Sequence, residues 1–245
     1  RVDLAALAAK IKEIADQVKK LNSELTALDP GAKPAKVVLT LDFGSVKANS
    51  TEVTLTKEIM AALESNGIGN VAVQVNGVVV VVQASAYQAE TKVVIGRKDA
   101  KTATGITNLP LASEVYEFEI YKDGKQLIQF DSTIELRIPV ADVSKVDPEL
   151  LALAKIVDGK IVIYGGRYDA ASKKFVASRN SFSTYAVVEN KIEFHDISSV
   201  KDWAGRQIQV AGAKGIIEGR ERGLFVPNDK VTRAEFAKMI VVAFG

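Results

Sequence analysis

Apolar residues recur at alternating three- and four-residue steps along the first 28 residues. The positions are Leu4, Leu7, Ile11, Ile14, Val18, Leu21, Leu25 and Leu28. This spacing is a heptad seam, and Asp29-Pro30-Gly31 ends it, so that residues 1–30 are expected to form one amphipathic helix. Two partners fit the seam. The helix forms a coiled coil with a second copy of the chain through residues 4–28, or it packs on its own molecule.

Between residues 34 and 193 the pattern changes to short apolar runs and to alternation with a period of two. Asn76-Gly77 separates two Val-rich runs, which is typical of a tight hairpin. A helix is expected from Lys57 to Asn66, begun by Thr56. Strands are expected at 37–41, 71–75, 78–82, 91–95, 115–121, 127–130, 134–140, 156–157, 161–164, 167–168, 175–177 and 185–188. Many short strands separated by Gly, Asn and Asp predict an antiparallel β-sandwich.

The last stretch, residues 194–245, carries two helix patterns joined by a loop. Thr232 and Glu235 form a capping box, so that a helix begins at Thr232. Its apolar face is expected to pack on a preceding helix, from about Asp202 to Lys214, since both helices are amphipathic. The apolar face of that preceding helix is made by Trp203, Ile208, Val210 and Ala211. The stretch therefore reads as a helix-loop-helix module.

These patterns predict a multi-domain α+β protein with three parts. A long amino-terminal helix occupies residues 1–30, an antiparallel β-sandwich residues 34–193, and a helix-loop-helix module residues 194–245. This division follows the change of hydrophobic period from helical to two and back to helical.

Composition narrows the classes of function. The chain has 32 Lys and Arg against 30 Asp and Glu, and a net charge of +2, which argues against nucleic-acid binding because such proteins concentrate basic residues. There is no cysteine, so that neither disulfides nor thiolate chemistry is expected. No apolar run approaches the roughly 20 residues that a membrane-spanning helix needs. The chain opens on Arg1, and an export signal is expected to lie outside this sequence.

The candidates for catalysis are few. The one histidine, His195, cannot assemble a histidine-based metal site alone. Glu117 and Glu119 share a strand face and satisfy the spacing of a glycosidase pair, but any polar strand face does so as well. Serines have no histidine partner, and no phosphate-binding glycine motif is present. The sequence therefore indicates no enzyme, no cofactor and no metal site.

The last stretch resembles a known family. It reads F-H-D-I, D-W-A-G-R-Q-I, G-I-I-E-G-R-E-R-G-L-F-V-P-N and V-T-R-A-E-F-A-K-M-I. In length and spacing it is similar to one S-layer homology module, the helical unit with which bacterial surface proteins hold cell-wall polysaccharide. The resemblance implies an extracellular protein of the cell surface, cell wall or S-layer.

The resemblance also suggests binding residues. Arg233 matches the Arg of the family's T-R-A-E segment, which reaches an acidic sugar substituent, often a pyruvate ketal. Trp203 matches the early aromatic, and Gly219 a loop glycine. Asp196 matches an F-x-D position that is expected to cap the first helix. Arg220 stands where the family commonly has Tyr, which makes the groove more basic.

Two further expectations follow from this family. Arg222 replaces a common Asp, and it too makes the groove more basic. Such modules usually act in threes, so that further modules are expected as partners, in the full-length protein or from another chain.

The segment from Ile161 to Val187 is similar to the last strands of β-rich domains that often precede S-layer homology modules. In the preferred interpretation the β-region is a spacer or interaction domain of a wall-anchored protein without enzymatic activity. In the alternative, it is a carbohydrate-binding or accessory region of an extracellular polysaccharide-degrading enzyme whose catalytic domain lies elsewhere. That alternative needs several tyrosines on one face, drawn from Tyr87, Tyr116, Tyr121, Tyr164, Tyr168 and Tyr185.

Overall fold

The computed structural model describes residues 4–35, 37–87 and 89–244, without the side chains of residues 4, 5 and 222. The chain forms two compact units. The first holds the residues up to Ile95 together with Phe118–Glu135 and Arg179–Phe182, and the second holds the rest. The predicted domain boundaries, 1–30, 34–193 and 194–245, stay a prediction.

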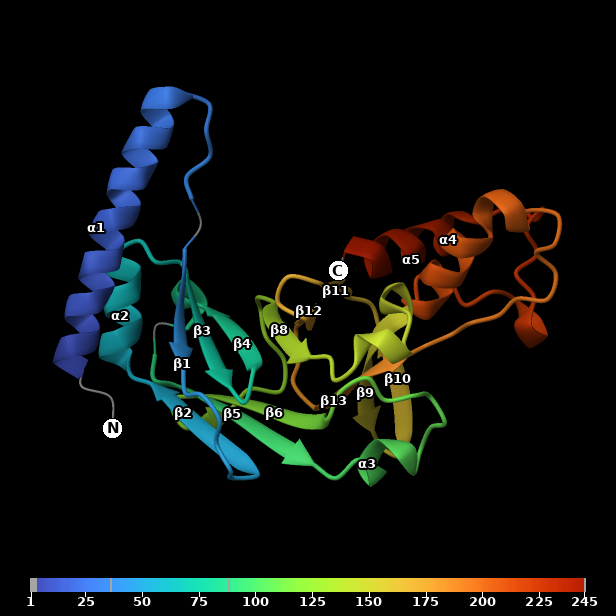
Figure 1. Ribbon diagram of the computed structural model, residues 1–245, viewed down its shortest axis with the longest axis horizontal. Coiled ribbons are helices and arrows are strands. Elements are labelled where there is room, and N and C mark those ends of the chain that lie inside the picture. Colours follow the sequence, from blue (N-terminus) through green and yellow to red (C-terminus); the bar gives the residue numbers. More distant parts are fainter. Residues whose placement is uncertain (1–3, 36, 88, 245) are drawn as a thin grey trace. The chain divides into compact units, whose positions relative to one another are not determined.

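In the first unit two helices accompany a small set of strands (Figure 1). Helix α1 spans Leu4–Leu28 and contacts α2, which spans Lys57–Ser65. Strand β1 (Val38–Asp42) runs parallel to β3 (Asn70–Val75), which pairs antiparallel with β4 (Val78–Gln83). Asn76 and Gly77 both have positive φ, as the predicted Asn-Gly hairpin requires.

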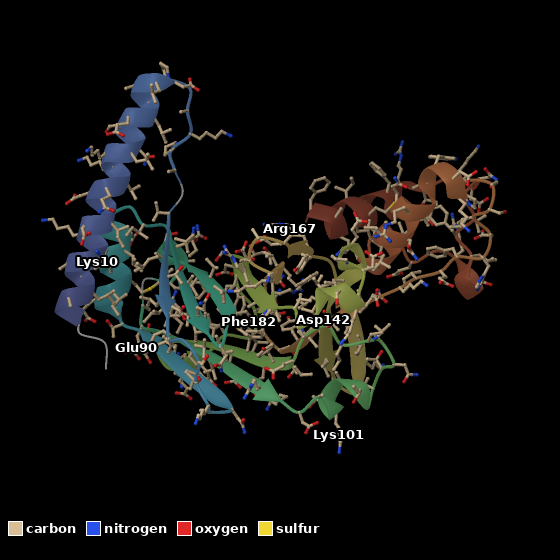
Figure 2. The ribbon with its side chains drawn as sticks, in the orientation of Figure 1. Lys10, Glu90, Lys101, Asp142, Arg167 and Phe182 are labelled. Atoms are coloured by element: carbon tan, nitrogen blue, oxygen red, sulfur yellow. The ribbon has the colours of Figure 1, made fainter. Side chains whose placement is uncertain are left out.

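The seam of α1 is only partly covered. Ile11 is fully buried, whereas Leu21 is 48% and Leu28 86% exposed. Lys10 pairs with Glu13 on the outer face of this helix (Figure 2). The amino-terminal half thus packs on its own unit, as the second of the two alternatives expects, and the carboxy-terminal half leaves apolar side chains in solvent. The side chain of Leu4 lies outside the described residues.

The strands belong to two mainly antiparallel sheets. One has the order β1-β3-β4-β8-β12-β11 and the other β10-β9-β13-β6-β5-β2, with β7 paired to β6. The bounds of the strands not yet given are β2 Ser50–Leu55, β5 Thr91–Lys98, β6 Val115–Lys122, β7 Lys125–Gln126, β8 Ile134–Pro139, β9 Leu151–Val157, β10 Lys160–Tyr164, β11 Arg167–Asp169, β12 Lys174–Arg179 and β13 Thr184–Glu189. Together with the helices they confirm the predicted α+β class.

The second unit is built around β13, which pairs antiparallel with both β9 and β6. Strands β9 and β13 are almost wholly buried, and a short hairpin at Asp158-Gly159 joins β9 to β10. The short helix η3 (Pro148–Leu150) leads into β9, and Asp147 caps it by accepting a hydrogen bond from the amide of Glu149. This corner between η3 and β9 contacts the C-terminal module.

The structure corrects three details of the strand prediction, and the first is that β9 begins at Leu151 and not at residue 156. Residues 127–130 were expected to form a strand, but the strand here is β7, which ends at Gln126. Ile128 is 81% exposed, whereas Phe130 is 6% exposed and packs against Phe182 without forming a strand. Strand β2 was not expected, because its sequence S-T-E-V-T-L is mostly polar. The remaining short elements are α3 Lys101–Thr104, η1 Ala84–Ala86 and η2 Val143–Lys145.

The C-terminal module, residues 194–245, contains two helices and a loop, as predicted. Helix α4 spans Lys201–Ala213 and α5 spans Arg233–Phe244, with a short turn, η4 (Glu221–Gly223), between them. Gly215 has φ +70 and follows the end of α4, where a left-handed residue commonly stops a helix. The module lies in the second unit together with β9 to β13.

Candidate functional site

The start of α5 is fixed by reciprocal hydrogen bonds. The Thr232 amide donates to Glu235 Oε2 at 2.8 Å, and the Glu235 amide donates to Thr232 Oγ1 at 3.2 Å. The hydrogen bond from the Thr232 amide is the main cause that lowers the pKa of the Glu235 carboxyl. Two amides of the helix start, which have no partner within the helix, are thereby satisfied.

Arg220 belongs to the same cluster. Its Nη1 lies 2.8 Å from Glu235 Oε1, and its Nε lies 3.9 Å from Asp229 Oδ2. Arg220 and Gly219 line a pocket of about 250 Å³ between the loop and α5, with apolar walls that include Phe225 and Met239. Arg220 is therefore engaged in an ion pair at the rim of a small pocket, where its charge is largely compensated.

Arg233 differs from Arg220 in its surroundings. It is the first residue of α5 and is exposed. Among residues 4–35, 37–87 and 89–244, the Arg233 side chain has no hydrogen-bond or ion-pair partner. Arg233 does not line the pocket beside Arg220. Its five donors are consequently available to a ligand, at a helix end whose dipole favours anions.

Trp203 corrects an expectation. The prediction placed it in the apolar face of α4, but it is 73% exposed. Of the predicted apolar face Ile208 is buried, and on α4 Gly212 and Ala213 are buried as well. Trp203 thus has a free surface for stacking, but it does not line the pocket of Gly219 and Arg220. The four predicted binding residues are not gathered in one cavity.

Helix α5 corrects a second expectation, that its apolar face packs on α4. No residue of α5 from Arg233 to Phe244 is buried. Large apolar side chains are exposed along it, and with their exposed fractions they are Phe236 60%, Ile240 43%, Val241 66%, Val242 37% and Phe244 85%. Burying them would release several kcal/mol at about 25 cal/mol per Å² of apolar surface, so this face is the least satisfied surface of the module.

Asp196 is structural, but not as a cap of α4. The residue before α4 is Val200, which makes no side-chain cap. The Asp196 carboxylate accepts hydrogen bonds from the amides of Phe225 at 2.8 Å and Val226 at 2.7 Å, and the first of these is the main cause that lowers its pKa. Asp196 therefore ties the start of the module to the loop, across about 30 residues of sequence.

Gly219 is required by the packing of this loop. It has φ +69, and a Cβ there would lie 2.4 Å from a ring carbon of Phe194 and 2.6 Å from the carbonyl oxygen of Leu224. Phe194 also packs against Phe225, with ring centroids 5.5 Å apart. Steric packing alone thus explains why a glycine stands at this position, which the family resemblance suggests for binding. The side chain of Arg222 lies outside the described residues.

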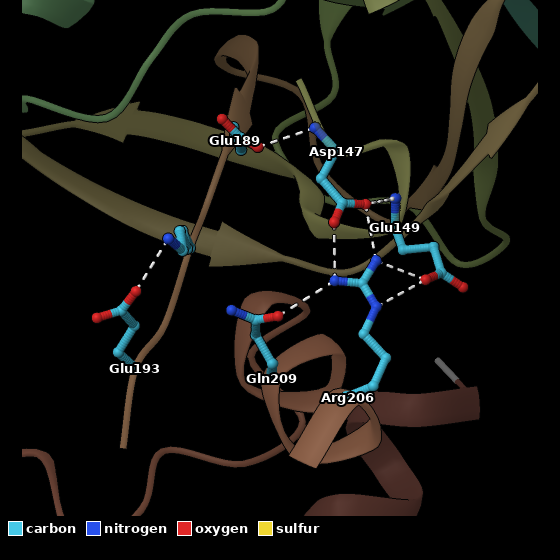
Figure 3. A network of polar contacts seen from close by, with 7 residues as sticks. Asp147, Glu149, Glu189, Glu193, Arg206 and Gln209 are labelled. Atoms are coloured by element: carbon cyan, nitrogen blue, oxygen red, sulfur yellow. Dashed lines mark hydrogen bonds and ion pairs between the residues drawn. The ribbon is translucent and has the colours of Figure 1, made fainter. Parts of the chain in front are cut away.

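One polar network was missed by the sequence analysis. Arg206 of α4 contacts both Asp147 and Glu149, which flank the start of η3 (Figure 3). Lys214 follows the last residue of this helix, and its ammonium donates to the carbonyl oxygen of Leu151. Burial lowers the pKa of this amine to about 8. No local signal could have found these contacts, since their partners lie about 60 residues apart.

The candidates for catalysis do not form a site. His195 is exposed, and no group of three or more metal-ligating side chains occurs within the described part of the chain. Glu117 pairs with Lys98 at 2.8 Å, and Glu119 accepts a hydrogen bond from the Tyr121 hydroxyl at 2.6 Å. Both carboxylates therefore interact with neighbouring polar side chains, as expected for an ordinary polar strand face and not for a glycosidase pair.

The tyrosines do not form one platform. Tyr87, Tyr116 and Tyr185 are buried, with exposures of 3%, 3% and 0%. Burial is the first cause that raises the pKa of the Tyr87 hydroxyl to about 12. Only Tyr121, Tyr164 and Tyr168 keep part of their surface in solvent.

In the described residues, no helix has the length and apolar character needed to cross a membrane.

Known proteins share parts of this sequence. Residues 193–237 match the model of the S-layer homology domain. An amylopullulanase of Thermoanaerobacterium thermosulfurigenes is 39% identical over 77 residues, which are 31% of this chain and 4% of that protein. An endoglucanase of Bacillus sp. (strain KSM-635) is 43% identical over 44 residues, which are 18% of this chain and 5% of that protein.

The matched stretches thus span only about a twentieth of the length of these two relatives. The family match covers α4, the loop with Gly219 and Arg220, and the first residues of α5 with Arg233. The capping box, the Asp196 contacts and the loop glycine all lie within it. Residues 193–237 of this chain are an S-layer homology domain.

Proposed function

We propose that the C-terminal module contributes to non-covalent anchoring of an extracellular protein to cell-wall polysaccharide, with the β-rich region as spacer or interaction domain. The observation that carries this proposal is the S-layer homology domain at residues 193–237. Arg233 at the start of α5, which has no side-chain partner among the described residues, supports it. No catalysis is assigned to this chain.

Arg233 is the residue proposed to contact the glycan. A guanidinium holds a carboxylate through two parallel hydrogen bonds, which suits an acidic sugar substituent such as a pyruvate ketal. The dipole at a helix start favours the same anion. Trp203 offers an exposed aromatic face, whereas Arg220 is already compensated by Glu235. Arg233 is therefore expected to matter more than Arg220.

Further S-layer homology modules are proposed as partners of α5. The exposed Phe236, Ile240 and Phe244 form an apolar face that single surface residues do not explain. A neighbouring module, in the full-length protein or from another chain, would cover this face. Such an arrangement would place Arg233 close to the neighbour.

Sedimentation with purified cell walls tests the anchoring. The protein is mixed with walls of a Gram-positive bacterium, and the bound fraction is measured for the wild type and for Arg233→Ala. Loss of one charge-assisted contact is expected to weaken binding by roughly 10-fold. Lys201→Ala is the matched control, since it removes one exposed positive charge from the start of the other helix. Equal binding by wild type and Arg233→Ala would remove Arg233 from the site.

A second function is favoured by the names of the relatives. Both are enzymes by name, an amylopullulanase and an endoglucanase. In this reading the chain is an accessory or carbohydrate-binding part of an extracellular polysaccharide-degrading enzyme, with its catalytic domain outside this sequence. A glycan array with the whole chain separates the two readings. Binding to plant or storage polysaccharide that survives Arg233→Ala would favour the second.

Self-association through residues 4–28 stays a proposal. Leu21 and Leu28 are exposed, so the proposed contact between two copies would involve the carboxy-terminal half of α1. The test compares the mass of the wild type with that of the double variant Leu21→Ser and Leu28→Ser in analytical ultracentrifugation. A mass that is monomeric already in the wild type would remove the coiled coil.

A further inference from the structure

One guanidinium of the C-terminal module bridges two carboxylates of the β-rich region within the same compact unit. Arg206 Nη1 lies 2.7 Å from Asp147 Oδ2, and Arg206 Nη2 donates to Asp147 Oδ1 at 2.8 Å. Arg206 Nε donates to Glu149 Oε2 at 2.9 Å, and Nη1 also donates to the side chain of Gln209 at 3.1 Å. The planar guanidinium is thus contacted along several of its edges (Figure 3).

The Asp147 residue is held in place by contacts other than the one with Arg206. Asp147 accepts a hydrogen bond from the amide of Glu149 at 3.1 Å, and its own amide donates to Glu189 Oε1 at 2.8 Å. The hydrogen bond from Arg206 is the first cause that lowers the pKa of the Asp147 carboxyl. Because Asp147 is already ordered by its contacts with η3 and β13, its ion pair with Arg206 loses less conformational entropy than a pair between free side chains.

Contacts at the end of α4 reinforce this arrangement. The Asn190 amide group donates to the carbonyl oxygen of Ala213 at 2.9 Å, and the Lys214 ammonium donates to that of Leu151. Ala213 is fully buried and Asn190 is 6% exposed. Helix α4 is therefore held to the β-rich region at its middle and at its end.

We propose that Arg206, Asp147 and Glu149 form a latch that fixes the S-layer homology domain on the β-rich region of its unit, so that this part of the chain is a rigid extension and not a flexible tether. The side chains of Arg206, Asp147 and Glu149 are 41%, 35% and 65% exposed, which makes the latch sensitive to salt. A wall-binding surface on the module would then have a fixed direction. That consequence rests on the proposed anchoring, whereas the latch can be measured without any wall material.

Trp203 is a built-in probe for this latch. It is the one tryptophan of the chain, and it lies on α4 three residues before Arg206. Time-resolved fluorescence anisotropy of Trp203 separates local motion of the ring from the tumbling of the body that carries it. In the wild type at low salt the slow component is expected to match the tumbling of the whole second unit as one body. In Arg206→Gln a faster component from independent motion of the module is expected to appear. The amplitude of the slow component is then expected to fall.

Matched variants keep the test decisive. Asp147→Asn with Glu149→Gln breaks the latch from the other side and is expected to give the same decay as Arg206→Gln. High salt should reproduce the change in the wild type but add little in Arg206→Gln. Lys201→Gln removes a charge from α4 that has no place in the latch and should leave the decay unchanged.

The result that would overturn the latch is equally clear. If Arg206→Gln and the double variant both tumble as slowly as the wild type, the buried contacts of α4 alone fix the module. A failure of wall binding with an intact latch would instead count against the anchoring role, so that the two proposals fail separately.

Discussion

The two helices of the C-terminal module differ in how much of their apolar surface is covered. Helix α4 buries Ile208, Gly212 and Ala213 and is tied by Arg206 and Lys214 to the β-rich region. Helix α5 also carries large apolar side chains, yet none of its residues from 233 to 244 is buried. Amphipathicity therefore shows that a helix has a partner face, but not whether that partner is in the same chain. In the proposed function, the partner of α5 comes from another module.

Gly219→Ala is expected to have the largest effect, because Gly219 shapes the loop between the two helices. A side chain would enter the left-handed region and clash with Phe194 and Leu224, which should cost about 3 kcal/mol or more. The measurement is urea unfolding followed by Trp203 fluorescence, which reports on the module. The midpoint should fall well below that of the wild type.

Gly159→Ala is the control for the steric part of this effect. Gly159 has φ +67, close to the +69 of Gly219, but a Cβ there meets no atom within 4 Å. Its substitution should cost only the left-handed backbone term, about 1 kcal/mol. Equal losses in the two variants would show that the contact with Phe194 is relieved in solution.

A pair of identical substitutions tests the difference between α4 and α5 directly. Ile208 is 7% exposed and Ile240 is 43% exposed. Ile208→Ala should lower the free energy of unfolding by about 2 to 4 kcal/mol, since it leaves a cavity, and Ile240→Ala by less than about 1 kcal/mol. Both values come from urea unfolding of the purified chain. Similar losses in both would mean that the α5 face is covered in solution, for example by a second copy.

The smallest expected effect is the pH dependence that comes from Lys214. Burial lowers its pKa to about 8, below the roughly 10.4 of an exposed lysine. Between these values the unfolded chain binds more protons than the folded one, so that the free energy of unfolding rises with pH over this window. Because the side chain is partly exposed, the slope should stay well below about 1.4 kcal/mol per pH unit.

Lys214→Met provides the control for this slope. The variant keeps a long apolar stem but has no titrating amine, so that its stability should change less with pH between about 8 and 10. An identical pH profile in both proteins would mean that Lys214 is solvated in the folded state. Circular dichroism during urea unfolding at each pH gives the measurement.

Local signals in the sequence predicted most of the secondary structure. Thr56 caps α2, Asn76-Gly77 turns the hairpin of β3 and β4, and Thr232 with Glu235 starts α5. Each of these depends on hydrogen bonds or backbone angles within a few residues, which is why a sequence can specify them. Strand β2 was not predicted because its residues are mostly polar. A strand was predicted at residues 127–130 because they are apolar, but whether an apolar run forms a strand depends on its pairing with a neighbouring strand.

The candidate site was predictable only in part. The family motif identified Arg233, Gly219 and Trp203 as positions to examine, but it did not tell which of them are exposed, paired or gathered in a pocket. Arg220 turned out to be compensated by Glu235, and Arg233 to have no partner among the described residues. Pairing and exposure depend on neighbours that are distant in sequence, and a motif does not contain them.

The sequence by itself determined the α+β class, the helix starts and turns, and the S-layer homology signature, because these reside in periodicity and in short-range chemistry. Only the tertiary structure decided that Asp196 holds the loop, that Arg206 meets Asp147 and Glu149, and that Trp203 and the face of α5 are left in solvent. These outcomes depend on which surfaces meet when the chain folds. That choice is made by the packing of the whole unit and not by any one segment.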